Sequence, residues 1–258
     1  MFRIAMEPRK HFRLLLASVM GLVALHSTSA RAGDRDRLRE IVEEQCVPHW
    51  LAAHDPAPCS SVSRGAPARG YAVLADRKGG AHYLLIPTET ISGIESPEVR
   101  APGAPNYFGA AWDARKVLDG VIGAPLPQDA IGLAVNHVHA RSQDQLHIHM
   151  SCVKRSVHDE LYAAADHITS EWSSVTIGGV DYSALRVMGK KLGKANPFEL
   201  LADRLPGASE AMGDFTLFVA GMKFKRGPGF VVLAGHAVPG AELMLDSTCA
   251  VAKLAGAL

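Results

Sequence analysis

The sequence predicts an α+β fold built on an antiparallel sheet that is flanked by helices. Apolar runs of strand length occur in pairs joined by a few polar residues, which indicates hairpins rather than crossover connections. Segments with apolar residues at helical spacing lie between these pairs. A chain of 258 residues with 48% hydrophobic and 21% charged residues is long enough to bury a core. This composition excludes a disordered tail protein, a collagen-like repeat, a coiled coil and a polytopic membrane protein.

The spacing of apolar residues sets the elements predicted before residue 125. Residues 34–44 are apolar only at Leu38, Ile41 and Val42, which is typical of a helix. The next predictions are a Pro-rich irregular loop at 46–68, strands at 70–75 and 81–87, and a helix at 107–118. The two strands flank Asp-Arg-Lys-Gly-Gly, a sequence that favours a turn.

The second half of the chain continues the same pattern. It predicts strands at 130–139 and 145–153, a helix at 158–173, and hairpin strands at 214–222 and 229–237. Polar or Gly- and Pro-containing turns join the members of each strand pair. Strands joined in this way pair antiparallel, which supports the predicted sheet.

The first 32 residues have the three-part order of a secretory signal. A basic start precedes the apolar run Leu14 to Leu25, and small residues follow it up to Ala32. Twelve apolar residues are fewer than the ~20 that span a bilayer, so we expect cleavage after Ala32, with a retained signal anchor as the alternative. Either way, residues 33–258 are expected to be exported, to the periplasm or the periplasmic face of the inner membrane.

The net charge of +1 is distributed unevenly along the chain. The first 32 residues hold five basic groups and one acid, so 22 basic and 25 acidic residues remain in the rest, a net charge of −3. Such a body has no bulk electrostatic attraction to nucleic acid, which is therefore not an expected partner.

The cysteines predict two disulfides, because an even number follows an export signal. Four cysteines allow three pairings. Cys46 and Cys59 bracket a short segment rich in Pro and Ala, the easiest loop to close, and by elimination Cys152 then pairs with Cys249. The alternative is that some of them are buried thiols.

The strand predicted at 145–153 carries the residues best suited to chemistry. Side chains alternate between the two faces of a strand, ~6–7 Å apart along one face. The two faces hold Leu146, Ile148 and Met150 against Gln145, His147 and His149. Two imidazoles on one face supply a nucleophile with a second polar group beside it. The alternative is the solvated face of an edge strand.

These residues resemble the histidine-triad (HIT) signature of nucleotide hydrolases and transferases. The match comprises Asn136, Arg141-Ser142-Gln143 and the run from Gln145 to Met150. The wider context resembles the CDP-diacylglycerol pyrophosphatase family within that superfamily: an exported N-terminus, Leu-Leu-Ile-Pro-Thr, Glu-Ser-Pro, and Ser-Cys after the histidines. The resemblance implies a HIT-like antiparallel sheet in one catalytic domain. Its parts are an N-terminal helix and Cys loop at 33–69, a motif-bearing core at 70–155 and a C-terminal extension at 156–258.

The resemblance also implies an activity. The family hydrolyses the pyrophosphate bond of CDP-diacylglycerol, giving CMP and phosphatidate, in phospholipid metabolism. The middle histidine of the motif, which aligns with His147, is the nucleophile, and His149 aligns with the third histidine, which helps to bind the phosphate. The partners implied are the membrane lipid substrate, water and the inner membrane, by peripheral or anchored contact. No metal or other cofactor is implied.

Four further residues are expected to bind the phosphate or the nucleotide, namely Asn136, Ser142, Gln143 and Gln145. Gln145 departs from the family pattern, which has histidine at the first triad position. An amide cannot carry the charge of a protonated imidazole, but it can donate to a phosphate oxygen. The departure therefore bears on activation rather than on the identity of the nucleophile.

Two other functions fit the same residues. One is hydrolysis of a water-soluble nucleoside diphosphate compound. The other is an exported metal-binding protein, in which the two His-x-His pairs meet on neighbouring strands and bind zinc or copper. The four histidines in that hypothesis are His137, His139, His147 and His149.

Overall fold

The computed structural model describes residues 1–2, 35–63, 65 and 68–254. Apart from Met1 and Phe2, the predicted signal at 1–32 lies outside the described residues. Within the described part, no helix has the length and apolar character needed to cross a bilayer.

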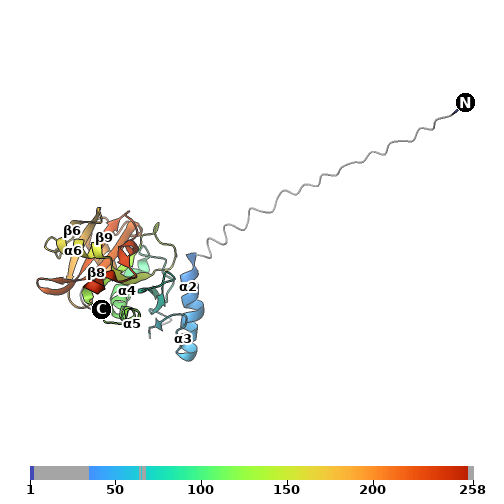
Figure 1. Ribbon diagram of the computed structural model, residues 1–258, viewed down its shortest axis with the longest axis horizontal. Coiled ribbons are helices and arrows are strands. Elements are labelled where there is room, and N and C mark those ends of the chain that lie inside the picture. The colour runs from blue at the N-terminus through green and yellow to red at the C-terminus, as the bar shows by residue number, and fades with distance from the viewer. Residues whose placement is uncertain (3–34, 64, 66–67, 255–258) are drawn as a thin grey trace.

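Ten strands in the described residues form a single antiparallel sheet, which confirms the predicted fold class (Figure 1). Their order is β1-β2-β3-β5-β4-β8-β9-β7-β6, and β10 pairs with β5. The strands are β1 Ser61–Val62, β2 Tyr71–Ala75, β3 His82–Pro87, β4 Ile131–Val135, β5 Ile148–Val153, β6 Ser173–Ile177, β7 Val180–Met188, β8 Phe215–Phe224, β9 Gly227–His236 and β10 Leu245–Asp246.

Short helices connect and cover these strands. The α-helices are α2 Arg37–Ile41, α3 Val47–Ala53, α4 Tyr107–Ala114, α5 Val117–Ile122, α6 Arg155–Ala163, α7 Pro197–Arg204 and α8 Ala250–Leu254. The other helical turns are the π-helix η1 Val42–Cys46 and the 3₁₀ turns η2 Pro97–Arg100, η3 Gln128–Ala130, η4 Met212–Asp214 and η5 Ala241–Met244.

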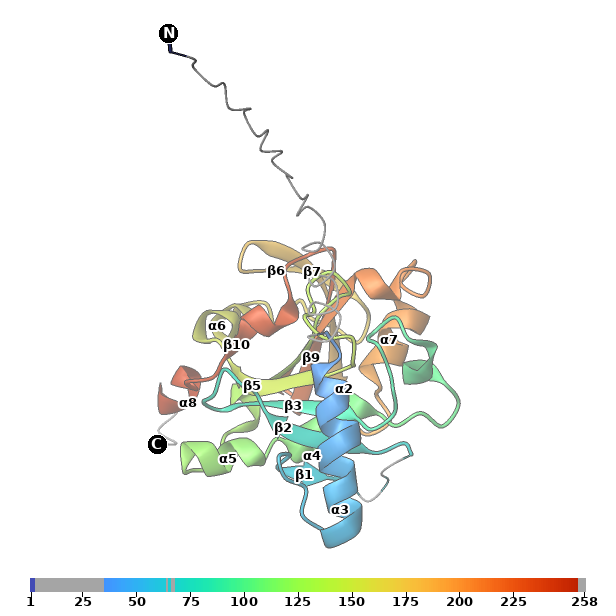
Figure 2. The same ribbon diagram turned by 90° about the vertical axis from the view of Figure 1, so that its right-hand side faces the viewer.

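The N-terminal helix is longer than predicted. Helical structure runs from α2 through η1 into α3, so the first part of the loop predicted at 46–68 is wrong. Pro48 falls in the first turn of α3, directly after the π-helical turn, where its missing N–H is tolerated. This helix stands along the β1–β2–β3 end of the sheet (Figure 2). Its apolar side forms a small core with that end, which includes Leu38 and Val42 of the helix and Leu84 of β3.

Both predicted disulfides are present. Cys46–Cys59 closes the loop after the N-terminal helix. Cys152–Cys249 joins β5 to the turn before α8 and so holds the C-terminal segment beside the motif strand. β10 reinforces this connection, since Leu245 and Asp246 pair with Val153 and Cys152.

Several predicted boundaries are displaced. β4 ends at Val135 because the chain turns there, and the N–H groups of Ala140 and Arg141 donate to the carbonyl of His137. β5 begins only at Ile148, and α6 is shorter than the predicted helix 158–173. The hairpin of β8 and β9 is as predicted, whereas β6, β7 and α7 were not predicted.

The motif strand β5 lies inside the sheet, between β3 and β4. All six of its residues are buried. Ile148 and Met150 pack in the main core with Trp112 and Phe108 of α4. The interpretation of His147 and His149 as the solvated face of an edge strand is therefore wrong.

Candidate active site

His147 lies directly before β5 and is 7% exposed. Its Nδ1 is 2.7 Å from the carbonyl oxygen of Gln145. A carbonyl can only accept, so Nδ1 carries the hydrogen and Nε2 keeps its lone pair. Burial lowers the pKa of His147, which keeps the ring neutral at neutral pH. This is the state in which an imidazole acts as a nucleophile.

His149 follows on β5 and lies beside His147, with the ring centroids 4.9 Å apart. Its Nδ1 is 3.0 Å from Nε2 of His82, which β3 brings to the same place. Burial holds the pKa of His149 well below its ordinary value, and the neighbouring His147 and His82 lower it further. The imidazoles of His147, His149 and His82 thus lie side by side, all with a lowered pKa that favours the neutral form.

Gln145 does not continue the row of histidines. Its side-chain nitrogen donates to the carbonyls of Pro87 and Glu89, at 3.1 and 2.9 Å. Both amide hydrogens are therefore engaged by the main chain, while Oε1 is buried without a hydrogen-bond partner among the described residues. In this arrangement the amide holds the segment after β3 against the histidines and does not offer the expected donor to a phosphate.

The other three predicted binding residues lie at different depths. Asn136 is 6% exposed, and its Oδ1 accepts from the backbone N–H of Glu242. Gln143 accepts from the N–H of Leu38 and so connects the turn to the N-terminal helix. Ser142 is exposed on the same turn.

A small hollow, with a volume of about 10 Å³, brings part of the predicted set together. His147, Asn136 and Gln145 line it, whereas Ser142, Gln143 and His149 are not among its lining residues. The complete lining is Ser92, Gly93, Val135, Asn136, Arg141, Gln145, Leu146 and His147. The candidate nucleophile is thus at a concave surface.

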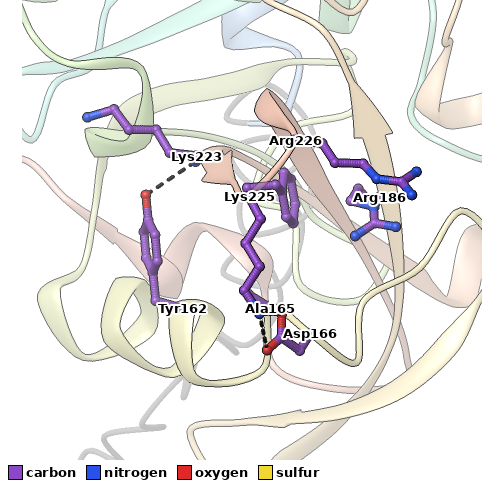
Figure 3. Close-up of a pocket in the computed structure, with 8 residues that line it drawn as sticks. Tyr162, Ala165, Asp166, Arg186, Lys223, Lys225 and Arg226 are labelled. Atoms are coloured by element: carbon purple, nitrogen blue, oxygen red, sulfur yellow. Dashed lines mark hydrogen bonds and ion pairs between the residues drawn. The ribbon is translucent and has the colours of Figure 1, made fainter.

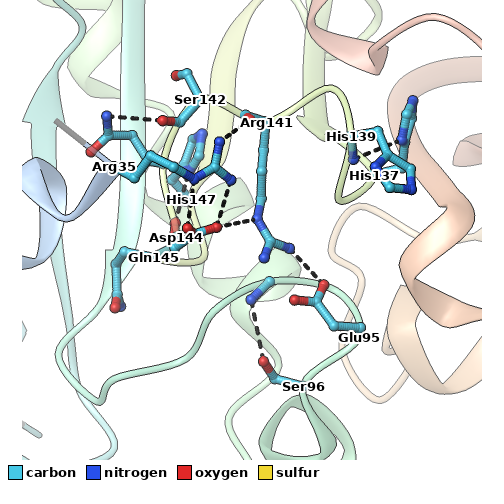
Figure 4. Close-up of polar contacts among 12 residues, drawn as sticks. Arg35, Glu95, Ser96, His137, His139, Arg141, Ser142, Asp144, Gln145 and His147 are labelled. Carbon is cyan, nitrogen blue, oxygen red and sulfur yellow. Dashed lines mark hydrogen bonds and ion pairs between the residues drawn. The ribbon is translucent and has the colours of Figure 1, made fainter. Parts of the chain in front are cut away.

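Arg141 supplies the cation of this hollow and was not predicted as a site residue. Its side chain is 7% exposed and lies between Glu95, at 2.6 Å, and Asp144, at 3.1 Å. Arg35 also contacts Asp144, at 2.6 Å (Figure 4). Gly93 makes room for this network, since a Cβ there would lie 2.1 Å from Nη1 of Arg141. The ion pairs fix the turn that precedes His147.

A second cluster of polar side chains surrounds His149. Oε2 of Glu242 lies 3.3 Å from Nε2 of His149 and 3.3 Å from Nζ of Lys78. Asp76, His82 and His149 place potential metal-ligand atoms within 4.8 Å of one another. Sequence reasoning did not identify His82 or Glu242, because each stands alone in its segment and meets His149 only through strand pairing.

The four-histidine metal site is not formed. His137 and His139 lie on the turn after β4, with ring centroids 6.0 Å apart, and the N–H of His139 donates to Nδ1 of His137. Neither belongs to the metal-capable group found among the described residues. The prediction failed because β4 ends before these residues, so they do not extend the strand beside β5.

A larger hollow, of about 440 Å³, lies at the opposite end of β8 (Figure 3). Its lining is Tyr162, Ala165, Asp166, Arg186, Lys223, Phe224, Lys225 and Arg226. Lys225 contacts Asp166 at 2.8 Å, and the N–H of Lys223 donates to the hydroxyl of Tyr162. Because this lining contains no imidazole, the histidine hollow is the candidate active site.

Comparison with known proteins identifies the family of the chain. A family model described as CDP-diacylglycerol pyrophosphatase matches residues 33–253. A relative named CDP-diacylglycerol pyrophosphatase, from Yersinia pestis, is 39% identical over 250 residues, which cover 94% of this chain and 95% of the relative. The chain therefore belongs to the CDP-diacylglycerol pyrophosphatase family.

Proposed function

We propose that the chain hydrolyses the pyrophosphate bond of CDP-diacylglycerol to CMP and phosphatidate, with His147 as the nucleophile. Family membership supports the enzyme activity and the substrate. One observation carries the mechanism: Nδ1 of buried His147 donates to the carbonyl of Gln145, which leaves Nε2 free to attack.

The reaction proceeds in two steps. Nε2 of His147 attacks the phosphorus next to the cytidine, a P–N bond forms, and the bridging P–O bond breaks to release phosphatidate. Water then attacks the same phosphorus, the P–N bond breaks, and CMP leaves. The electron pair of the P–N bond returns to Nε2, so His147 regains its neutral form. Water supplies the hydroxyl group of CMP, and the proton it loses passes to phosphatidate or to solvent.

Charge gathers on the phosphate oxygens in both steps, so positioned donors and cations give the main assistance. Arg141 lines the hollow with His147 and offers its guanidinium there. His149 lies against the His147 ring, and its Nε2 is buried without a hydrogen-bond partner among the described residues, so it can donate to a phosphate that enters beside His147. These groups support a reaction that needs no metal.

We also propose that the enzyme is exported and meets its lipid substrate at the periplasmic face of the inner membrane. The basic and apolar N-terminus supports export. The two disulfides are consistent with an oxidising compartment. Arg35, which follows the predicted signal in the sequence, contacts Asp144 on the turn that precedes β5.

Substitution of His147 by Asn tests the nucleophile. The Asn side-chain nitrogen can still donate to the Gln145 carbonyl, while the attacking Nε2 is removed. Release of CMP should fall by several orders of magnitude, because the covalent route is lost. His149→Asn should cost about 10²–10³-fold, as for one lost donor. His139→Asn, on the exposed turn, is the matched control and should leave turnover unchanged.

The same assay separates this mechanism from metal catalysis. Turnover by the wild type should persist in a strong chelator. Near-normal CMP release by folded His147→Asn would contradict the nucleophile assignment. Loss of turnover on chelation, restored by added metal, would favour a metal hydrolase. Faster cleavage of soluble CDP-alcohols than of CDP-diacylglycerol would point to the water-soluble substrate class.

A further inference from the structure

The C-terminal extension brings one carboxylate into the histidine cluster. Glu242 lies on η5, and its Oε2 is 3.3 Å from Nε2 of His149. The two atoms are not aligned for a hydrogen bond. Both side chains are largely shielded from solvent, that of Glu242 being 23% exposed and that of His149 5% exposed. Lys78 balances part of the carboxylate charge from the other side, at 3.3 Å.

Glu242 is held where it is by connections to the strands that carry the site. Its N–H donates to Oδ1 of Asn136, at the end of β4. A Cβ at Gly240 would lie 2.9 Å from that same oxygen, so glycine allows the close approach. Downstream, β10 and the Cys152–Cys249 disulfide join the segment to β5. The hydrogen bond to Asn136, the β10 pairing and the disulfide together fix the position of Glu242 beside His149.

The charge of Glu242 determines which nitrogen of His149 carries the hydrogen. Nε2 of His82 and Nδ1 of His149 are 3.0 Å apart, so one of these two atoms donates to the other. If Nδ1 of His149 donated, its Nε2 would turn a lone pair toward the Glu242 carboxylate, which is repulsive. A hydrogen on Nε2 instead faces the carboxylate favourably.

We propose that Glu242 is a positioning residue of the hydrolase, which keeps the hydrogen of His149 on Nε2 so that this atom donates to the reacting phosphate. His82 then donates from its own Nε2 to Nδ1 of His149. The proposal rests on the proposed function, because it assigns His149 to the phosphate. It adds a residue that neither the motif nor the family match identifies, from a segment about 90 residues beyond the histidines.

Replacement of Glu242 by Met tests the role, since Met has a similar length and no acceptor. The kcat should fall about tenfold, because the electrostatic preference for a hydrogen on Nε2 is lost, with a smaller change in KM. Glu242→Gln keeps an acceptor without the charge and should retain more activity than the Met variant. Glu210→Met, at an exposed carboxylate, is the matched control and should not change kcat.

The pH profile distinguishes positioning from a structural role. Burial lowers the pKa of His147, and Arg141 lowers it further, whereas the hydrogen bond to Gln145 and the carboxylates of Glu242 and Asp76 raise it. Without the carboxylate, the pKa of His147 falls, so the acid limb of kcat should move to lower pH in both Glu242 variants. The control variant should keep the wild-type limb.

Nuclear magnetic resonance gives a readout that does not require turnover. Long-range ¹H–¹⁵N spectra of ¹⁵N-histidine-labelled wild type, assigned with the His149→Asn variant, should show the hydrogen of His149 on Nε2, and Glu242→Met should shift it toward Nδ1. A wild-type hydrogen on Nδ1, or a folded Glu242→Met enzyme with an unchanged kcat and acid limb, would overturn the proposal. Near-normal activity of His147→Asn would instead refute His147 as the nucleophile. It would not change the position of the His149 hydrogen that the spectra report.

Discussion

His147 and His149 are placed by geometry that is local to the chain, which is why the sequence alone identifies them. Residues two apart share one side of an extended segment, and the two rings lie 4.9 Å apart. Gln145 does not follow the same rule because the chain bends at that residue, before the extended segment begins. Its side chain turns instead to the carbonyls of Pro87 and Glu89.

The partners of the histidines could not be predicted in this way. His82 lies 67 residues from His149 in the sequence, and Glu242 lies beyond the unpredicted elements β6, β7 and α7. Their contacts depend on strand order and on the end at which each strand begins, which no short pattern encodes. Arg141 was quoted in the motif, but its burial between two carboxylates depends on the distant loop that carries Glu95.

A pH prediction follows from the ion pairs of the active-site turn. The hydrogen bond from Arg35, with that from Arg141, lowers the pKa of Asp144 to about 2 from 3.8. A carboxyl with a lowered folded-state pKa stabilises the protein above its unfolded pKa, and this stability is lost as pH falls from about 4 toward 2. The side chain is 37% exposed, so solvent screening makes the effect modest.

Asp144→Asn should therefore unfold at lower urea concentration than the wild type at pH 7. The difference should shrink as the pH falls from about 4 toward 2, where the wild-type carboxyl also becomes neutral. Asp181→Asn, at an exposed position on β7, serves as the control. A difference of the same size at both ends of this range would show that the ion pairs do not stabilise the turn.

At the scale of elements, hairpins were predicted better than helices. β2 with β3, and β8 with β9, are continuous apolar runs on either side of a turn, and their pairing needs no information from elsewhere. β6 and β7 were missed because strands were sought as continuous apolar runs, whereas β6 alternates exposed and buried residues before the turn at Gly178-Gly179. The N-terminal helix was predicted too short because Pro48 was interpreted as a helix breaker, while a π-helical turn places it in a first turn.

The two disulfides should differ in their contribution to stability. Cys152–Cys249 spans 97 residues and Cys46–Cys59 spans 13. In the loop-entropy account, closing the longer loop stabilises the folded state by about 4–5 kcal/mol and the shorter one by about 3 kcal/mol. The longer disulfide also holds the segment with Glu242 against β5.

Replacing both cysteines of each pair by Ala, followed by urea unfolding, compares the two. Loss of Cys152–Cys249 should lower the free energy of unfolding by more than loss of Cys46–Cys59, and it should also reduce turnover. The Cys46–Cys59 variant provides the matched control for removal of a disulfide as such. Equal losses of stability, with turnover retained in both variants, would show that the C-terminal segment stays in place without its disulfide.

The described residues form one sheet, and the candidate catalytic histidines lie on its inner strand β5 or directly before it. The two ends of the sheet are covered differently. The N-terminal helix covers the β1 end, and β6 lies at the other end (Figures 1 and 2). Arg35, the first residue described after the predicted signal, contacts the turn that leads into β5. The nine residues between Leu25 and Arg35 span at most about 30 Å when extended, so an anchor in the apolar run would keep the active site close to a membrane.

Export can be tested on the mature protein. We expect the chain produced from the full-length sequence to be recovered outside the cytoplasm, to begin at Gly33 and to contain both disulfides, because the apolar run is short and small residues precede the expected cleavage site. Cell fractionation measures the compartment, and intact mass under non-reducing conditions with N-terminal sequencing measures the other two features. A version that lacks residues 1–32 is the control and should stay in the cytoplasm with free thiols. A full-length mass in the membrane fraction would favour the retained anchor, whereas cytoplasmic recovery of the full-length product with four free thiols would contradict export.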